Sequence, residues 1–296
     1  MKPIFYVRAV YGAMILAALL SVQGVAGAQS HPRVSPGGDQ VAHFRFDLEA
    51  GTSDILVTDL ATGETTPQPS GQGWSVNPVW SSEGDSIVFI GGPRGMRDVW
   101  DVYEVRLSDG AVTALTRTPE REMHSQVSPN GDQIAFVRMT QGPHVWLLDR
   151  GATEARQLTT GPARDFHPKW MPDGSGLIFD RSDDATPSRI VRVSVTDGTE
   201  TVLGEAPATG RLRLPNVGPT GQVYAIQSVD TDYALVQLHD DGVTDTVLHA
   251  NQGEVFGAFD IHPDGQSVFL TVTGLDDRER LYRVELESGS RSLVYE

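Results

Sequence analysis

The sequence contains no cysteine, and this absence excludes disulfide bonds, thiolate metal ligands and a lipid anchor on a processed cysteine. A surplus of positive charge is also lacking, because 23 lysine and arginine residues stand against 39 aspartate and glutamate residues, for a formal charge of -16. Such a surface repels phosphate backbones and anionic lipid, so we expect no nucleic-acid partner. A basic partner, a polycation or a divalent metal ion remains compatible with this charge.

Motifs for catalysis and cofactor binding are missing as well. The sequence has no Gly-x-Ser-x-Gly nucleophile elbow, no glycine-rich turn that leads from a strand into a helix, and no calcium loop. Paired carboxylates such as Asp183-Asp184 fall in expected turns, where acidic side chains accept local backbone hydrogen bonds. We therefore predict no catalytic residue and no cofactor.

The amino terminus carries a secretory pattern. Lys2 and Arg8 precede an apolar run at residues 9–20, and residues 26–28 (Ala-Gly-Ala) are small enough for a signal peptidase. We expect residues 1–28 to be a secretory signal peptide, and the mature chain to be periplasmic without membrane insertion. An uncleaved inner-membrane anchor is the alternative, because residues 9–28 carry no charge and approach the ~20 residues of a spanning helix.

One eight-residue phrase recurs six times in the rest of the chain. It reads HPRVSPGG at 31–38, NPVWSSEG at 77–84, HSQVSPNG at 124–131, HPKWMPDG at 167–174, LPNVGPTG at 214–221 and AFDIHPDG at 258–265. The closing glycines are 46, 47, 43, 47 and 44 residues apart. Each phrase is typical of a strand that ends in a tight turn, because its last position favours the positive φ that glycine adopts.

Further β-rich runs follow each phrase. After residues 124–131, for example, come residues 133–137, 144–148 and the more polar 155–159, which suits an outer edge strand. Four antiparallel strands per unit, repeated six times, predict an all-β fold, a six-bladed β-propeller of four-stranded antiparallel blades over residues 29–296. The expected blades are at about 31–70, 77–119, 124–161, 167–204, 214–250 and 258–296.

The order of strands predicts how the ring closes. The first unit starts with its inner strand and the last ends with its outer strand, at residues 291–295. Blade six should therefore pack on blade one without a shared strand. A linear stack of the same sheets is the alternative, but it would expose two end faces, and neither end unit is polar enough to be a cap.

The six phrases resemble the repeat of TolB-type propellers, whose usual core is His-x-Pro-x-Trp-Ser-Pro-Asp-Gly or a close variant. The resemblance covers residues 31–296 and implies a periplasmic propeller that binds an envelope protein such as a lipoprotein. Proteins with the full TolB organisation have an additional α/β domain before the propeller. The sequence leaves no room for that domain between Ala28 and His31, so we do not expect this chain to be TolB proper.

Four residues occupy the first position of their phrases and are expected at the mouth of the central channel: His31, Asn77, His124 and His167. Three imidazoles at one mouth are a potential transition-metal site. We favour a structural role, in which the histidines bond neighbouring backbone. Blades one and four hold His31 and His167 nearly half the ring apart, which should make shared ligation difficult.

The loops that lead into the inner strands are expected at the same mouth, and they carry the residues we predict to bind a partner. Aromatic and arginine side chains on loops are typical interface anchors, whereas arginines paired with local carboxylates would form an ordinary solvated rim. The predicted partner-binding residues are Trp74, Arg121, Glu122, Arg164, Asp165, Arg211, Arg213 and Phe256.

These observations favour a monomeric, non-catalytic platform that presents its loops to an envelope protein. The alternative is a metal-assisted lyase or hydrolase that acts on an acidic saccharide through the channel-mouth histidines, since oligogalacturonate lyases carry similar repeats and use channel histidines with a metal. A third possibility is a propeller that serves only as a module of a larger complex.

Overall fold

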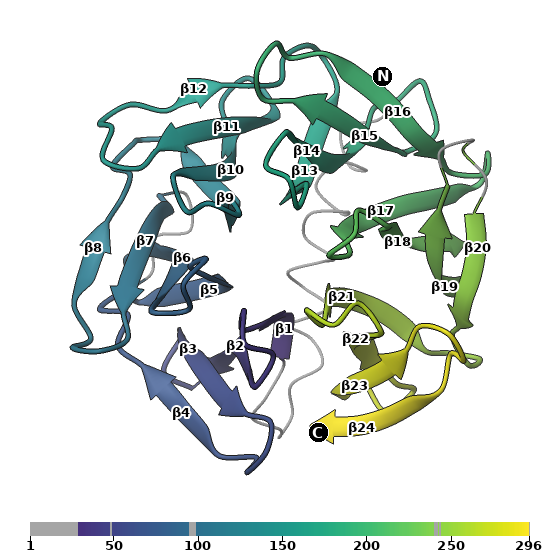
Figure 1. Ribbon diagram of the computed structural model, residues 1–296, viewed down its shortest axis with the longest axis horizontal. Coiled ribbons are helices and arrows are strands. Elements are labelled where there is room, and N and C mark those ends of the chain that lie inside the picture. Colours follow the sequence, from purple (N-terminus) through teal and green to yellow (C-terminus); the bar gives the residue numbers. More distant parts are fainter. Residues whose placement is uncertain (1–28, 48, 95–98, 240–241, 243, 296) are drawn as a thin grey trace, which may run out of the picture.

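The computed structural model describes residues 29–47, 49–94, 99–239, 242 and 244–295, and the expected signal peptide lies outside them. Within these ranges the chain forms six four-stranded antiparallel sheets arranged around a central axis (Figure 1). The all-β, six-bladed propeller predicted from the repeats is confirmed. No helix in the part of the chain that the structure describes is long and apolar enough to cross a bilayer.

Each blade is built from one contiguous stretch of chain, with its inner strand first and its outer strand last. Blade one consists of β1 (Gln29–Val34), β2 (Gln40–Asp47), β3 (Thr52–Asp59) and β4 (Thr65–Gln68). Blade two consists of β5 (Trp74–Trp80), β6 (Ser86–Gly92), β7 (Asp101–Arg106) and β8 (Val112–Ala114). Blade three consists of β9 (Arg121–Val127), β10 (Gln133–Met139), β11 (Pro143–Asp149) and β12 (Arg156–Gln157).

The second half of the ring follows the same order. Blade four consists of β13 (Arg164–Trp170), β14 (Gly176–Ser182), β15 (Arg189–Ser194) and β16 (Glu200–Glu205). Blade five consists of β17 (Gly210–Val217), β18 (Val223–Val229), β19 (Asp232–Leu238) and β20 (Thr244–His249). Blade six consists of β21 (Val255–Ile261), β22 (Ser267–Thr273), β23 (Glu279–Glu285) and β24 (Arg291–Tyr295).

The core lies between neighbouring blades and is supplied mainly by the second strands. Every residue of β6 is buried, and Phe89, Phe136 and Phe179 take the same place in β6, β10 and β14 with no exposed surface. An aromatic ring sandwiched between two sheets buries a large apolar area, which makes this position a repeated anchor of the fold.

Five inner strands share a backbone irregularity at the first position of the phrase. His31, Asn77, His124, His167 and Leu214 have φ values between 51° and 59°, and the ladder to the second strand shifts register at each of them. Among residues other than glycine, asparagine, aspartate and histidine are the ones that most readily adopt this left-handed conformation. The bulge therefore explains histidine at this position without any ligand.

The ring closes where blade six meets blade one. Val34, Val41, Phe269 and Leu281 form one buried cluster across this seam. The backbone N–H of Val34 donates to Oδ2 of Asp260 at 3.0 Å. No strand of the described residues is shared between the two blades, as predicted, so the seam depends on side chains rather than on a sheet ladder.

Phe269→Ala should lower the free energy of unfolding by about 3–5 kcal/mol, because it opens a cavity in the closing seam. Leu293→Ala is the matched control, since Leu293 lies on the outer strand and is 51% exposed; its effect should stay within about 0.5 kcal/mol. Urea unfolding measures the free energy of unfolding of both variants. Similar losses of this free energy in the two variants would contradict the inference that the seam stabilises the fold.

Glu279→Gln should stabilise the protein at about pH 7.5 and change little at about pH 4. Oε1 of Glu279 is buried and accepts no hydrogen bond from the described residues, and burial raises the pKa of this carboxyl from 4.5 to about 8. The folded chain thus keeps a proton that the unfolded chain releases, so stability falls as the pH rises through this window. Glutamine mimics the protonated group and should gain about 1–3 kcal/mol in urea unfolding. An equal gain at both pH values would disprove the assignment.

Candidate functional site

The inner strands bring two layers of polar side chains to the central channel. The first, the histidine layer, consists of His31, Asn77, His124 and His167. The second, the charged layer, lies two residues further along the same or equivalent strands and consists of Arg33, Lys169, Asn216 and Asp260. His31, His124, His167, Arg33 and Lys169 line one narrow cavity of about 20 Å³.

Three histidines of the first layer converge. Their ligand nitrogens all lie within 4.8 Å of one another, and the ring centroids of His124 and His167 are 4.2 Å apart. The expectation that the separation of blades one and four makes shared ligation difficult is wrong, because the inner strands approach the axis so closely that His31, His124 and His167 meet there. The geometry is that of a set of three potential metal ligands.

Neighbouring polar groups orient two of these rings. Nδ1 of His167 lies 2.7 Å from Oδ1 of Asp180, and Nδ1 of His124 lies 2.9 Å from Nδ2 of Asn77. Nδ1 of His31 is buried and has no hydrogen-bond partner among the described residues. A carboxylate on the far nitrogen is the usual support of a metal-binding histidine, so His167 is the best oriented of the three.

Two histidines of this layer, His31 and His124, are uncharged at neutral pH. Burial lowers the pKa of His31 well below its usual value, and the charge of Arg33 lowers it further. Burial likewise lowers the pKa of His124, with a further contribution from His167. Neutral imidazole is the form that binds a metal or accepts a hydrogen bond.

In the charged layer, one carboxylate serves two cations. Oδ1 of Asp260 lies 3.4 Å from Nζ of Lys169 and 3.9 Å from Nη1 of Arg33. Although burial opposes it, the charge of Lys169 holds the pKa of Asp260 below its usual value, with help from Arg33. Burial lowers the pKa of Lys169 to about 7, and Arg33 adds to this effect.

The inner strands begin at or next to the side chains that lie three positions before the first residue of the phrase. We call these the rim, and it consists of Trp74, Arg121, Arg164, Arg211 and Val255. Arg211 and Val255 are exposed and the other three are half-buried. Arg121, Arg164 and Arg211 belong to the consecutive blades three, four and five, and their role in binding a partner stays a prediction.

Two rim arginines already have neighbours within the protein. Nη2 of Arg164 lies 2.6 Å from Oδ1 of Asp184, and the guanidinium of Arg121 lies 4.2 Å from the ring centroid of Trp100. Arg213, also predicted to bind a partner, is half-buried beside the channel, with its guanidinium 5.9 Å from the ring centroid of Tyr233.

Glu122, Asp165 and Phe256 differ from the prediction, because each has no exposed surface. All three occupy the position next to the rim, and alternation along a strand turns that position into the blade interior. Glu122 accepts hydrogen bonds of 3.0 and 2.7 Å from Arg138. They stabilise the blades and do not offer a side chain to a partner.

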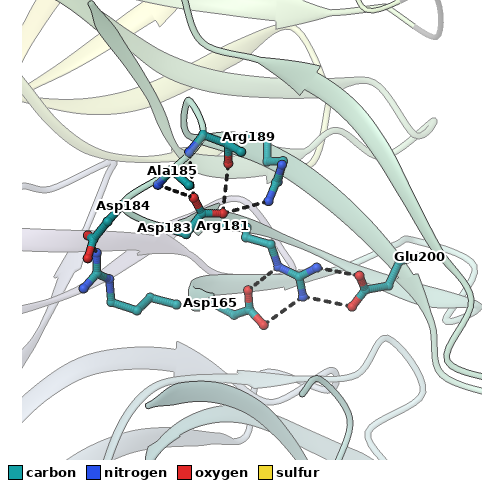
Figure 2. Close-up of polar contacts among 9 residues, drawn as sticks. Asp165, Arg181, Asp183, Asp184, Ala185, Arg189 and Glu200 are labelled. Carbon is teal, nitrogen blue, oxygen red and sulfur yellow. Dashed lines mark hydrogen bonds and ion pairs between the residues drawn. The ribbon is translucent and has the colours of Figure 1, made fainter. Parts of the chain in front are cut away.

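The equivalent pair in blade four is drawn in Figure 2. Arg181 lies between two carboxylates, donating to Asp165 at 2.6 and 3.0 Å and to Glu200 at 2.5 and 2.9 Å. The sequence held a signal for these pairs, since Arg138 and Arg181 stand at the same place in their second strands. A matched arginine opposite a matched acid indicates an internal ion pair rather than a surface.

A larger cavity of about 370 Å³ lies on the opposite face, where the turns of blades two and three meet. It is lined by Glu83, Asp85, Asp132 and other polar residues. Its Arg150 is held by both oxygens of Glu104, at 3.0 and 2.9 Å. Arg106, which also lines the cavity, lies 2.9 Å from Oδ2 of Asp109, so both arginines of the lining are already paired.

No protein-family model matches the chain. Among curated proteins, the Tol-Pal system protein TolB of Anaeromyxobacter dehalogenans is 30% identical over 123 residues, which cover 40% of this chain and 27% of that protein. Other curated relatives have 24% and 52% of their own length matched, so the chain spans about half of these proteins at most.

Solved structures share the architecture. TolB from Acinetobacter baumannii superposes with a TM-score of 0.62 at 15% identity, over 98% of this chain and 72% of that one. An oligogalacturonate lyase in complex with manganese gives a TM-score of 0.64 at 18% identity, over 90% of this chain and 79% of that one. Such identities establish the fold and not the activity. Taken with the six repeated phrases, they make this chain a TolB-like six-bladed β-propeller.

Proposed function

We propose that the protein is a non-catalytic binding platform of the bacterial envelope, and that its rim contacts an acidic surface of a partner protein. The observation that carries this proposal is the row of Arg121, Arg164 and Arg211 on three consecutive blades, in a chain whose formal charge is -16. Trp74 and Val255 flank the row and add apolar surface. The secretory pattern and the TolB-like fold support an envelope location and a partner such as a lipoprotein.

The rim is built so that a partner can replace its internal contacts at low cost. The side chain of Asp184 is 91% exposed and that of Arg164 is 33% exposed, and such surface ion pairs contribute about 0–1 kcal/mol. A carboxylate from a partner can therefore take the place of Asp184 with little loss. Arginine and tryptophan are also the residues most often found at the energetic centre of interfaces.

The double variant Arg164→Glu, Arg211→Glu should recover at least about tenfold less partner from an envelope extract than the native protein does. The matched control is Arg106→Glu, Arg156→Glu, which makes the same change of charge with two exposed arginines at the opposite ends of the blades. Quantitative mass spectrometry of the captured proteins measures the difference. A partner recovered equally by both double variants would remove the rim from the proposal.

A transition-metal centre in the channel is the second candidate function, favoured by the convergence of His31, His124 and His167. The residues fit such an ion, because three imidazoles would hold it and leave a further position open, where a bound metal would supply Lewis-acid chemistry. The nearby charges of Arg33 and Lys169 oppose a cation. The likeness to a manganese-bound oligogalacturonate lyase supports this candidate, and with it the alternative of an enzyme for acidic saccharides.

We place the saccharide enzyme behind the binding platform for a steric reason. The cavity beside the three histidines holds only about 20 Å³, roughly the space of one water molecule. A sugar ring would enter only if the inner strands moved apart. A metal bound in the channel is compatible with a platform that has no enzymatic activity.

Calorimetric titration of chelator-treated protein with Zn²⁺ or Mn²⁺ tests the metal centre. We expect one equivalent to bind, and binding to persist at about pH 6, where an ordinary histidine of pKa ~6.5 is mostly protonated. His124→Ala should abolish it, whereas the exposed control His249→Ala should retain it. Failure of the native protein to bind, or equal binding by both variants, would leave the histidines with the structural role that the bulge explains.

A further inference from the structure

The charged layer of the channel contains one more positive charge than negative. Arg33 is 8% exposed and Lys169 is 9% exposed, and Asp260 is the carboxylate that both of them face. Both oxygens of Asp260 are already engaged. Oδ2 accepts from the N–H of Val34 at 3.0 Å, and Oδ1 accepts from Asn216 at 3.0 Å and from Lys169 at 3.4 Å.

Donors are left over in this layer. Nε of Arg33 is buried and has no hydrogen-bond partner in the part of the chain that the structure describes, while Nη1 donates to the carbonyl of Pro32 at 3.0 Å. Nζ of Lys169 can donate three hydrogen bonds, and its contact with Asp260 is long. Burial of charged donors without an acceptor is costly, so the layer lacks an acceptor that carries negative charge.

The cavity that these donors line sets the size of that acceptor. At about 20 Å³ it has room for one species of about the size of a water molecule. His31, which also lines it, is half-buried. The site has one positive charge in excess and room for a single atom. A monatomic anion with one negative charge is complementary to it in both charge and size.

We propose that the channel binds one small monovalent anion of the size of chloride, held by Arg33 and Lys169 beside His31. This site belongs to the channel wall and is separate from the rim. Bound there, the anion supplies the missing acceptor and balances the charge between blades one, four and six. It also lowers the electrostatic cost of any cation in the histidine layer.

The experiment uses the full chain after treatment with chelator, so that a channel metal cannot supply the ligand for a halide. Crystals soaked in sodium bromide should show an anomalous peak in the cavity, at about 3.0–3.5 Å from Nε of Arg33 and Nζ of Lys169. In solution, the broadening of the ³⁵Cl magnetic resonance by the protein should saturate with chloride. A water molecule in the cavity without anomalous signal would overturn the proposal.

Variants assign the site to its residues. Lys169→Gln and Arg33→Gln should each weaken halide binding at least about tenfold, whereas the exposed control Arg106→Gln should leave it unchanged. If Arg33→Gln fails to fold, the halide affinity of Lys169→Gln and the anomalous signal in crystals of the native protein still test the proposal. Equal halide binding by Lys169→Gln and Arg106→Gln would refute the assignment. The rim variant Arg164→Glu, Arg211→Glu should still bind bromide, so failure of the platform and failure of the anion site are distinguishable.

Discussion

The left-handed bulge in the inner strands is the constraint on which the rest of the channel depends. A regular strand would alternate its side chains between two faces without interruption. The bulge at His31, Asn77, His124, His167 and Leu214 inserts a change of phase, so that the residues before and after it follow separate alternations. This one change decides which residues of an inner strand lie on the rim, in the blade interior, in the histidine layer or in the charged layer. The same change recurs in one blade after another.

The fold could be predicted from the sequence because its signal is repeated. Six phrases closing on glycine fix the number of blades, and the order of runs within each unit fixes the closure without a shared strand. A single phrase would have been ambiguous, since glycine turns and β-branched runs occur in every all-β class. Repetition turned a weak local preference into a global arrangement.

The site was harder to predict, for two physical reasons. The first is the alternation of side chains along the strand. Arg121 and Glu122 are adjacent in sequence, but Arg121 lies on the rim and Glu122 is buried. The bulge determines which of the two side chains faces the blade interior. The second is distance across the axis. His31 and His167 come from blades far apart along the ring, and the width of the channel that brings them together depends on how tightly all six sheets pack. Lys169 and Asp260 were overlooked for the same reason, because their partnership crosses the channel.

The two layers of the channel differ in the charges of their side chains. Burial and nearby cationic side chains lower the pKa values of His31 and His124 in the histidine layer, whereas the charged layer holds two basic side chains and only one carboxylate. A ligand in one layer therefore changes the electrostatic conditions of the other. The channel behaves as one coupled electrostatic unit rather than as two independent sites.

Closure by side chains has a topological consequence. Because every blade keeps all four of its strands within one continuous stretch, the six junctions between blades are alike: none is crossed by a ladder of backbone hydrogen bonds within the described chain. New termini could be cut into any loop between two blades, and the old seam joined by a linker, without breaking a strand pairing. The fold is thus a circle of interchangeable modules, and circular permutation or the gain of a whole blade needs no rewiring of its sheets.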